Sequence, residues 1–175
     1  MTNHRKEKQR LKTLSVLFDA GIVLTEEEQQ QIEIVDFGLG ELDKIGLQIF
    51  TYINTDRVCA KELILFPNQT CPEHKHPTIN NTLGKEETFR VRKGKVYLYV
   101  EGNPTNNIKA KLPNTKLTVF NEIILNEGEQ YTIYPDTLHW FQASDETAII
   151  SEFSTKSTDE LDIFTDSKIN RLANL

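Results

Sequence analysis

The chain has 175 residues, of which 38% are hydrophobic and 26% are charged, a composition that fits a soluble globular protein. Its 26 acidic and 20 basic residues give a net charge of -6, which disfavours nucleic acid as a partner. No stretch approaches the ~20 apolar residues of a membrane span, and the N-terminus lacks the apolar core of a signal peptide, so we expect a cytoplasmic protein without a membrane partner.

Two helices are predicted in the N-terminal part of the chain. Residues 5–20 form an amphipathic pattern that stops at Gly21, a suitable C-terminal cap. The apolar side chains at helical spacing are Leu11, Leu14, Leu17 and Phe18. Thr25 and Glu28 have the spacing of a capping box, which predicts a second short helix that ends before Asp36.

Beyond these helices the apolar pattern changes to short strands separated by turns rich in Gly, Pro and Asn. The predicted strands cover residues 47–52, 61–66, 87–91, 95–100, 117–125, 131–134, 140–143 and 147–153. Eight short strands at this spacing indicate a sandwich or a barrel.

Three histidines and one glutamate predict a metal site. His74 and His76 form a His-x-His pair, which on an extended segment points both rings to the same face. Glu87 begins a strand whose other inward residues are apolar, so its carboxylate needs a partner. His139 is followed by aromatic residues and should enter the protein rather than solvent. Imidazole and carboxylate groups are ligands for divalent metal ions, and the four residues together favour one site over four separate structural roles.

The remaining histidine and the two cysteines have simpler expected roles. His4 lies in a charged stretch and is expected at the surface. Cys59 and Cys71 are expected as reduced thiols, because the chain has no export signal. Cys71 lies three residues before His74, so a ligand role is conceivable for it.

Three further ionisable residues are candidates for a role beside the metal. Lys61 and Glu152 each share a strand face with apolar residues, where a charged group is costly unless it is paired. Such groups are candidates for proton transfer, although each could instead cap a strand end at the surface. Lys85 could reach the site from a loop and bind a substrate oxygen, or remain solvated. Arg90 should point to the face opposite Glu87.

The chain resembles the two metal-binding motifs of the cupin superfamily. The first motif is His-x-His, then a glutamate followed by six residues and a glycine. The second motif is a glycine, a proline and a histidine, in that order. The resemblance covers roughly residues 71–143 and implies that His74, His76, Glu87 and His139 are the ligands. It also implies a double-stranded β-helix, a small jelly-roll barrel. The loop of residues 77–86 is longer than the family pattern, which leaves Glu86 as an alternative, but the spacing to the glycine favours Glu87.

Local segments resemble a narrower family, the small D-lyxose isomerases, which are cupin sugar isomerases that use manganese. The matching segments are residues 59–63, 71–77, 84–89, 94–100, 137–141 and 151–155, within a resemblance that extends over about 36–171. It implies Mn²⁺ as the cofactor, a monosaccharide substrate and conversion of D-lyxose to D-xylulose, with D-mannose to D-fructose as a second pair. Glu152 would be the base and Lys61 would neutralise or protonate the developing oxyanion, although these roles can be exchanged and a hydride shift is an alternative path.

The expected organisation is one cupin domain over residues 1–175, with a helical segment at 1–40, the barrel at 41–153 and a tail at 154–175 that packs on the barrel. Such barrels commonly pair, and we expect a homodimer formed through the N-terminal helix or an edge strand. Two alternatives to the isomerase remain at this stage. One is another cupin enzyme, such as an iron dioxygenase, and the other is a sugar-binding module without catalysis.

Overall fold

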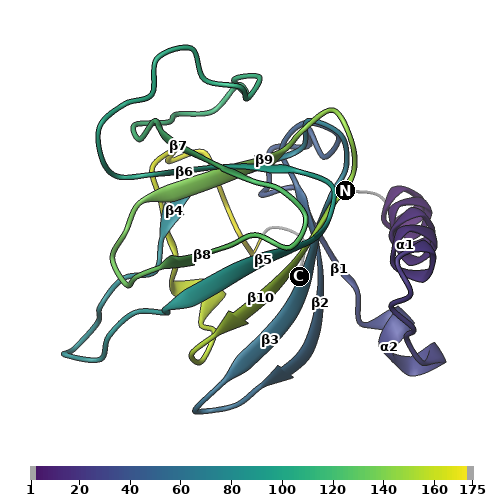
Figure 1. Cartoon of the computed structure of the whole chain (residues 1–175). Coiled ribbons are helices and arrows are strands. Elements are labelled where there is room, and N and C mark those ends of the chain that lie inside the picture. Colours follow the sequence, from purple (N-terminus) through teal and green to yellow (C-terminus); the bar gives the residue numbers. More distant parts are fainter. Residues whose placement is uncertain (1–2, 173–175) are drawn as a thin grey trace.

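The computed structural model describes residues 3–172, which form two antiparallel sheets that face each other, with a helical layer on one side (Figure 1). The helices are α1 (Asn3–Asp19), α2 (Glu26–Gln30) and the 3-10 helix η1 (Asp159–Leu161). The six-stranded sheet consists, in spatial order, of β1 (Glu33–Val35), β2 (Leu47–Asn54), β3 (Cys59–Leu65), β10 (Ala148–Ser154), β5 (Glu87–Lys93) and β8 (Gln130–Ile133). The five-stranded sheet consists of β11 (Ile163–Phe164), β4 (Thr70–Lys75), β9 (His139–Ala143), β6 (Val96–Val100) and β7 (Asn121–Leu125).

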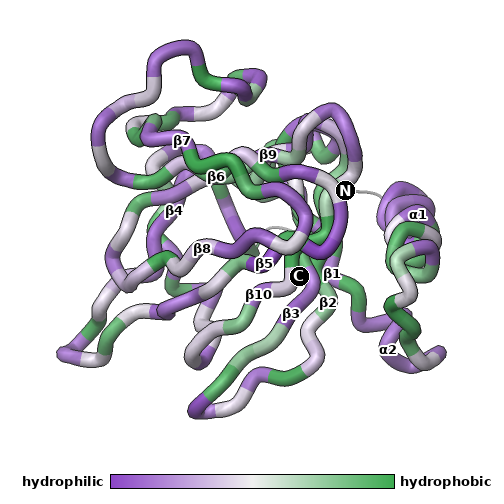
Figure 2. The backbone as a smooth tube through the Cα atoms, in the orientation of Figure 1, coloured by the Kyte–Doolittle hydropathy of each residue, from purple (hydrophilic) through white to green (hydrophobic). Residues whose placement is uncertain are grey.

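The main core lies between the two sheets and is made by alternate residues of the strands. In β5, Phe89 and Val91 are buried whereas Arg90 is exposed, as the two-residue period of a strand requires. Phe89 meets Phe141 of the opposite sheet edge to face, with ring centroids 5.0 Å apart. Figure 2 shows hydrophobic stretches along β6 and β7 and hydrophilic residues on many of the outer loops. The predicted all-β jelly-roll barrel with N-terminal helices is confirmed.

The helix α1 covers the outer side of the six-stranded sheet with a face that is more polar than the sequence indicates. Its most buried side chains are Gln9, Thr13 and Leu17, four residues apart. Gln9 Nε2 donates to Oε1 of the buried Gln48 on β2 at 3.0 Å, so the helix docks partly through amide groups. Phe18, which the helical pattern groups with the core residues, is 74% exposed.

The second helix begins as predicted but is shorter. The capping box of Thr25 and Glu28 is present, and α2 ends at Gln30. The predicted extension to Asp36 is wrong, because residues 33–35 form β1 and pair with β2. Pairing with a strand further along the chain, in which Val35 lies opposite Leu47 and Glu33 opposite Ile49, outweighs local helix propensity here.

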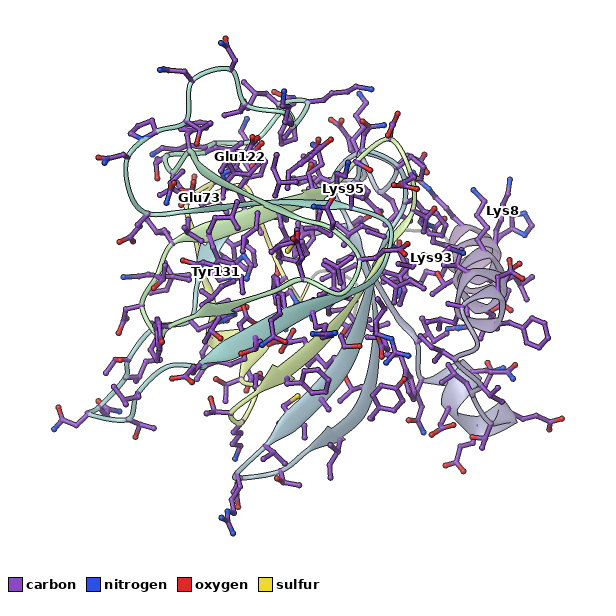
Figure 3. All side chains as sticks on the ribbon, viewed as in Figure 1. Lys8, Glu73, Lys93, Lys95, Glu122 and Tyr131 are labelled. Atoms are coloured by element: carbon purple, nitrogen blue, oxygen red, sulfur yellow. The ribbon has the colours of Figure 1, made fainter. Side chains whose placement is uncertain are left out.

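All but one of the predicted strands form within two residues of their expected bounds. The exception is the strand expected at 117–125, of which only β7 is extended and paired. Thr118 and Val119 instead donate their backbone N–H groups to the carboxylate of Glu73, at 2.6 and 2.9 Å. Figure 3 labels Glu73 on the side of the barrel below the long connection of residues 101–120 between β6 and β7. A distant acceptor therefore decides the backbone conformation at this point.

The C-terminal segment lies against the barrel in the part of the chain that the structure describes. Within it, β11 pairs with β4 at the edge of the five-stranded sheet, with Phe164 opposite His74. The backbone N–H of Asn170 donates to the carbonyl of Phe37 at 2.9 Å. Among residues 3–172, no helix has both the length and the apolarity that crossing a bilayer requires.

Candidate active site

Three histidines meet where β4 and β9 pair at the inner face of the five-stranded sheet. His74 on β4 lies opposite His139 on β9, and His76 follows the end of β4. All three side chains are buried, and one ring nitrogen from each lies within 4.8 Å of the others. The sheet register therefore brings together imidazoles that are more than 60 residues apart in the sequence.

The local backbone sets the orientation of two of these rings. His74 Nδ1 donates to the carbonyl oxygen of Pro72 at 2.8 Å, and His139 Nδ1 donates to the carbonyl oxygen of Thr137 at 2.9 Å. Because a carbonyl can only accept, each Nδ1 carries the hydrogen and each Nε2 of a neutral ring keeps a free lone pair. Burial lowers the pKa of His74 well below its usual value, and the two neighbouring imidazoles add to this effect. His74 is thus held in its neutral, ligand-competent form.

Glu87 completes the group from β5. Its Oε1 lies 3.2 Å from His76 Nε2 and 3.1 Å from His139 Nε2. Burial would raise the pKa of Glu87, but the nearby cations Lys85 and His76 outweigh it and hold the pKa well below the usual range. Glu86 is exposed, so the glycine spacing identifies the inward residue correctly.

His76 differs from the other two histidines in having carboxylates on both ring nitrogens. Its Nδ1 lies 2.5 Å from Asp162 Oδ1, on the opposite side of the ring from Glu87. Burial and the Lys85 ammonium lower the pKa of His76. The carboxylates of Glu87 and Asp162 act the other way and raise it to about 9.

The donor set fits a divalent metal ion. Within the described part of the chain, His139 Nε2 is buried without a hydrogen-bond partner, because the polar atom beside it, Glu87 Oε1 at 3.1 Å, is an acceptor like the Nε2 of the neutral ring. A buried, unpaired acceptor is costly unless a ligand satisfies it. Imidazole nitrogens and a carboxylate oxygen suit several divalent ions, and ligand type alone does not select one. Cys71 also borders the site, but burial raises the pKa of its thiol well above the usual value, which disfavours the thiolate that a metal needs.

Two lysines and two carboxylates form an ion-pair network beside the histidines. Glu152 on β10 is paired with Lys61 on β3 in the sheet register, and their charged atoms are 4.0 Å apart. Lys85 Nζ is closer, at 3.0 Å from Glu152 Oε1. Lys61 Nζ has its shortest contacts with Asp159 Oδ2 at 2.6 Å and Ser157 Oγ at 2.7 Å. Lys61, Lys85 and Glu152 are each at most 5% exposed. The alternative predictions, a strand end at the surface for Lys61 and Glu152 and a solvated side chain for Lys85, are therefore wrong.

A single cavity connects this network with the histidines. His74, His76 and Glu87 line it together with Lys61, Lys85 and Glu152. Aromatic and aliphatic residues form an apolar part of its wall, among them Leu63 and Phe141 from the two sheets and Phe37 from the turn after β1. A cavity with a few convergent polar groups on an apolar wall is the usual form of a small-molecule site.

Known proteins resemble this chain over nearly its whole length. The family model described as D-lyxose isomerase matches residues 24–175. The chain is 58% identical over 164 residues to the D-lyxose/D-mannose isomerase of Thermosediminibacter oceani, which covers 92% of this chain and 91% of that protein. It is 54% identical over 175 residues to the D-lyxose ketol-isomerase of a Thermofilum species, covering 98% of this chain and 97% of that protein. The chain belongs to the D-lyxose isomerase family.

Membership in this family makes the protein an aldose-ketose isomerase, an intramolecular oxidoreductase, as the sequence resemblance predicted. The choice between an enzyme and a sugar-binding module is thereby settled in favour of an enzyme. The L-ribose isomerase of Cellulomonas parahominis has a similar structure, with a TM-score of 0.80 at 15% identity, covering 97% of this chain and 95% of that one. At this identity the likeness shows the fold, which is cupin-like.

The C-terminal segment supplies site residues that sequence reasoning missed in this member of the D-lyxose isomerase family. Asp159, Asp162, Phe164 and Arg171 all line the cavity. Carboxylates are rarely buried, so the sequence favours a surface position for such residues. The segment is rich in Ser, Thr and Asp, and its composition does not show which acidic residues turn inward. Their position depends on the pairing of β11 with β4, which no local pattern reveals.

Proposed function

We propose that the protein interconverts D-lyxose and D-xylulose, with D-mannose and D-fructose as a second substrate pair. The names of the relatives support this choice, since one at 58% identity is a D-lyxose/D-mannose isomerase and one at 54% is a D-lyxose ketol-isomerase. We further propose that catalysis depends on a divalent metal ion, Mn²⁺, held by His74, His76, Glu87 and His139. The observation that carries this proposal is the buried, unpaired Nε2 of His139 within the three-histidine cluster.

When bound, such an ion would supply positive charge that polarises a sugar carbonyl and its neighbouring hydroxyl. The acid-base chemistry belongs to the protein. In the proposed path, the carboxylate of Glu152 takes the proton from carbon two of the open-chain aldose and returns it to carbon one. The hydroxyl proton on carbon two is lost as its carbonyl forms, and the oxygen on carbon one gains a proton, so the aldose and the ketose balance.

The two lysines would act on the sugar oxygens. Lys85 Nζ lies between Glu87 and Glu152, at 2.7 and 3.0 Å from their nearest oxygens, and can hold a substrate oxygen close to both carboxylates. Lys61, whose Nζ lies 4.0 Å from Glu152 Oε1, would neutralise the charge that develops on the substrate oxygen. An exchange of the roles of Glu152 and Lys61 satisfies the same proton balance, and single variants distinguish the two assignments.

The first test is metal reconstitution. The purified protein is stripped of metal, reloaded separately with manganese, cobalt, zinc or ferrous iron, and assayed for ketose formation from the aldopentoses and aldohexoses. We expect Mn²⁺ to restore conversion, with D-lyxose as the best substrate. Full activity without metal would contradict the metal-dependent proposal, and turnover that requires ferrous iron and dioxygen would favour the dioxygenase reaction.

The second test concerns Glu152. We expect Glu152→Gln to reduce kcat about 10²-fold to 10⁴-fold, the usual contribution of a general base, while the Kd for Mn²⁺ stays close to that of the unmodified protein. The reaction in ²H₂O should incorporate solvent deuterium into the ketose. Conversion of the aldose to the ketose without deuterium incorporation would indicate a hydride shift. Glu152 would then be a positioning group.

We also propose that the protein is a homodimer and that α1 contributes to the contact. Support comes from large apolar side chains that α1 and the following turn leave exposed, with Phe18 74% and Val23 81% exposed. The cytoplasmic location stays a prediction.

A further inference from the structure

His76 has a second contact that the barrel strands do not provide. Asp162, which follows η1, places its Oδ1 2.5 Å from His76 Nδ1, and its side chain is only 7% exposed. The rings of His74 and His139, by contrast, are oriented by carbonyl oxygens within two residues of themselves. The partner of His76 is 86 residues away in the sequence and is charged.

We propose that Asp162 is a positioning residue that orients His76 for metal binding, so that the C-terminal segment forms part of the metal site. This inference rests on the proposed metal site. The carboxylate accepts the Nδ1 hydrogen, which directs the Nε2 lone pair towards the other ligands. An anionic acceptor also makes the imidazole a stronger donor to a metal than a carbonyl oxygen does.

The segment around Asp162 is anchored on both sides, so the carboxylate is held in place. After Asp162, the Phe164 ring stacks on His74 with centroids 5.3 Å apart and planes inclined by 28°. Thr165 then donates its backbone N–H to the carbonyl of Glu73 at 3.1 Å and its hydroxyl to the Glu73 carboxylate at 2.5 Å.

Before Asp162, the carboxylate of Asp159 receives an ion pair from Lys61 at 2.6 Å. Asp159 also faces Lys85 and Arg171, at 3.5 and 3.8 Å. Because both flanks are fixed by contacts of their own, loss of the Asp162 side chain should leave the backbone of the segment in position. The effect of the carboxylate can therefore be separated from the docking of the segment.

The test is a titration of the metal-free protein with Mn²⁺ alone, with free ion followed by electron paramagnetic resonance. We expect Asp162→Ala to weaken the Kd about 10-fold to 100-fold, the usual effect of removing the partner of a metal-binding histidine. Asp162→Asn keeps an oxygen that can accept the Nδ1 hydrogen but loses the charge, so its Kd should fall between those of Asp162→Ala and the unmodified protein.

Asp166→Ala is the matched control, because Asp166 is a carboxylate of the same segment that binds Thr115 and Lys116 instead of a histidine. We expect it to leave the Kd for Mn²⁺ unchanged. An equal weakening in Asp166→Ala, or the same Kd in Asp162→Ala as in the unmodified protein, would overturn the role of Asp162. If the unmodified protein itself binds no Mn²⁺, the proposed metal site fails instead, so the two failures are distinct.

Discussion

Glu62 is a buried carboxylate that takes no part in the cavity. It lies on the outer side of the six-stranded sheet, where Ser151 donates to it at 2.9 Å and Tyr52 at 3.3 Å. These hydrogen bonds favour the charged form, yet burial outweighs them and raises the pKa of Glu62. The folded state therefore favours the protonated form of this side chain more than the unfolded state does.

This raised pKa has a defined effect on stability. The contribution of Glu62 is fully present below the pKa of the unfolded chain and is lost as the pH rises through the higher pKa of the folded state. The Gln side chain in Glu62→Gln stays neutral and keeps an acceptor for Ser151. The stability of this variant relative to the unmodified protein should therefore increase as the pH rises from the pKa of Glu62 in the unfolded chain through its higher pKa in the folded state. Urea unfolding over a pH series measures the difference.

The control is Glu27→Gln, at an exposed position in the first turn of α2. Its stability difference from the unmodified protein should not increase with pH in the same way. A difference for Glu62→Gln that stays constant over the series would contradict the assignment.

At the scale of single residues, the sequence indicates which side chains lie in the cavity when their spacing is local. The His-x-His interval and the distance to a glycine predict His74, His76 and Glu87 as one group, and all three line the cavity. Glu152 interrupts an apolar strand face in the sequence and lines the same cavity. Asp162 could not be found in this way, because its contact with His76 depends on tertiary packing of a segment with no periodic pattern.

Among the structural elements, the loop between His76 and Glu87 approaches the backbone of His76 closely at Gly84. A Cβ placed on Gly84 would lie 2.1 Å from the carbonyl oxygen of His76 and 2.7 Å from its carbonyl carbon. Such distances are far inside van der Waals contact, and both atoms belong to the backbone. Only glycine fits here without a shift of the loop, and the next residue, Lys85, lines the cavity.

We expect Gly84→Ala to push the loop away from His76 and to misplace Lys85. A displacement of this kind should reduce kcat/KM about 10²-fold, since small errors in positioning are costly for catalysis. Steady-state kinetics with D-lyxose on the manganese-loaded protein measures this effect.

Gly94→Ala separates lost positioning from lost stability. A Cβ on Gly94 would lie 2.4 Å from the carbonyl oxygen of Thr147, and the residue has a φ of 76°, so the substitution is strained at a turn outside the site. It should lower Tm while the protein that remains folded keeps its kcat/KM. Equal losses of kcat/KM in both variants would show that Gly84 acts only through stability.

The elements that the sequence misassigns are those decided by distant partners. The alternating pattern of a two-sided strand is visible in β5, where the buried Glu87, Phe89 and Val91 are separated by residues that are half-buried or exposed. The three-residue β1 is too short for such a pattern and exists because β2 pairs with it. Residues 117–120 have strand-like composition, but the carboxylate of Glu73 accepts hydrogen bonds from the N–H groups of Thr118 and Val119.

For the molecule as a whole, we propose that the chain folds as the single cupin domain predicted from the sequence. The helical segment 1–40 buries Leu17 and Ile34 in one cluster with Phe50, Ile64 and Ile149 of the six-stranded sheet. Because this cluster shares strands with the main core, we expect one cooperative thermal transition. Mn²⁺ should raise Tm in a concentration-dependent manner, because it would bind only the folded state.

Differential scanning calorimetry measures both effects. Two separate transitions would contradict the single domain, and a Tm that does not respond to Mn²⁺ would contradict the metal site. The magnesium-loaded protein is the control for a general effect of divalent cations.

The proposed dimer is tested at the surface of α1. We expect Phe18→Glu to shift the molecular mass measured by light scattering from that of a dimer towards that of a monomer, because a charge would be buried in an apolar contact. Lys8→Glu is the matched control on the same helix, since Lys8 is exposed and projects from α1 (Figure 3). A monomeric unmodified protein, or a dimer unaffected by Phe18→Glu, would contradict the proposed contact.

The position of β10 has a consequence for how the protein is made in the cell. This strand is inserted between β3 and β5 in the six-stranded sheet, although both of those strands are translated long before it. Until β10 leaves the ribosome, β3 and β5 each have an open edge that can pair with another chain. The emerging polypeptide therefore cannot close its barrel during most of translation, and chains terminated before β10 should aggregate and should depend on chaperones.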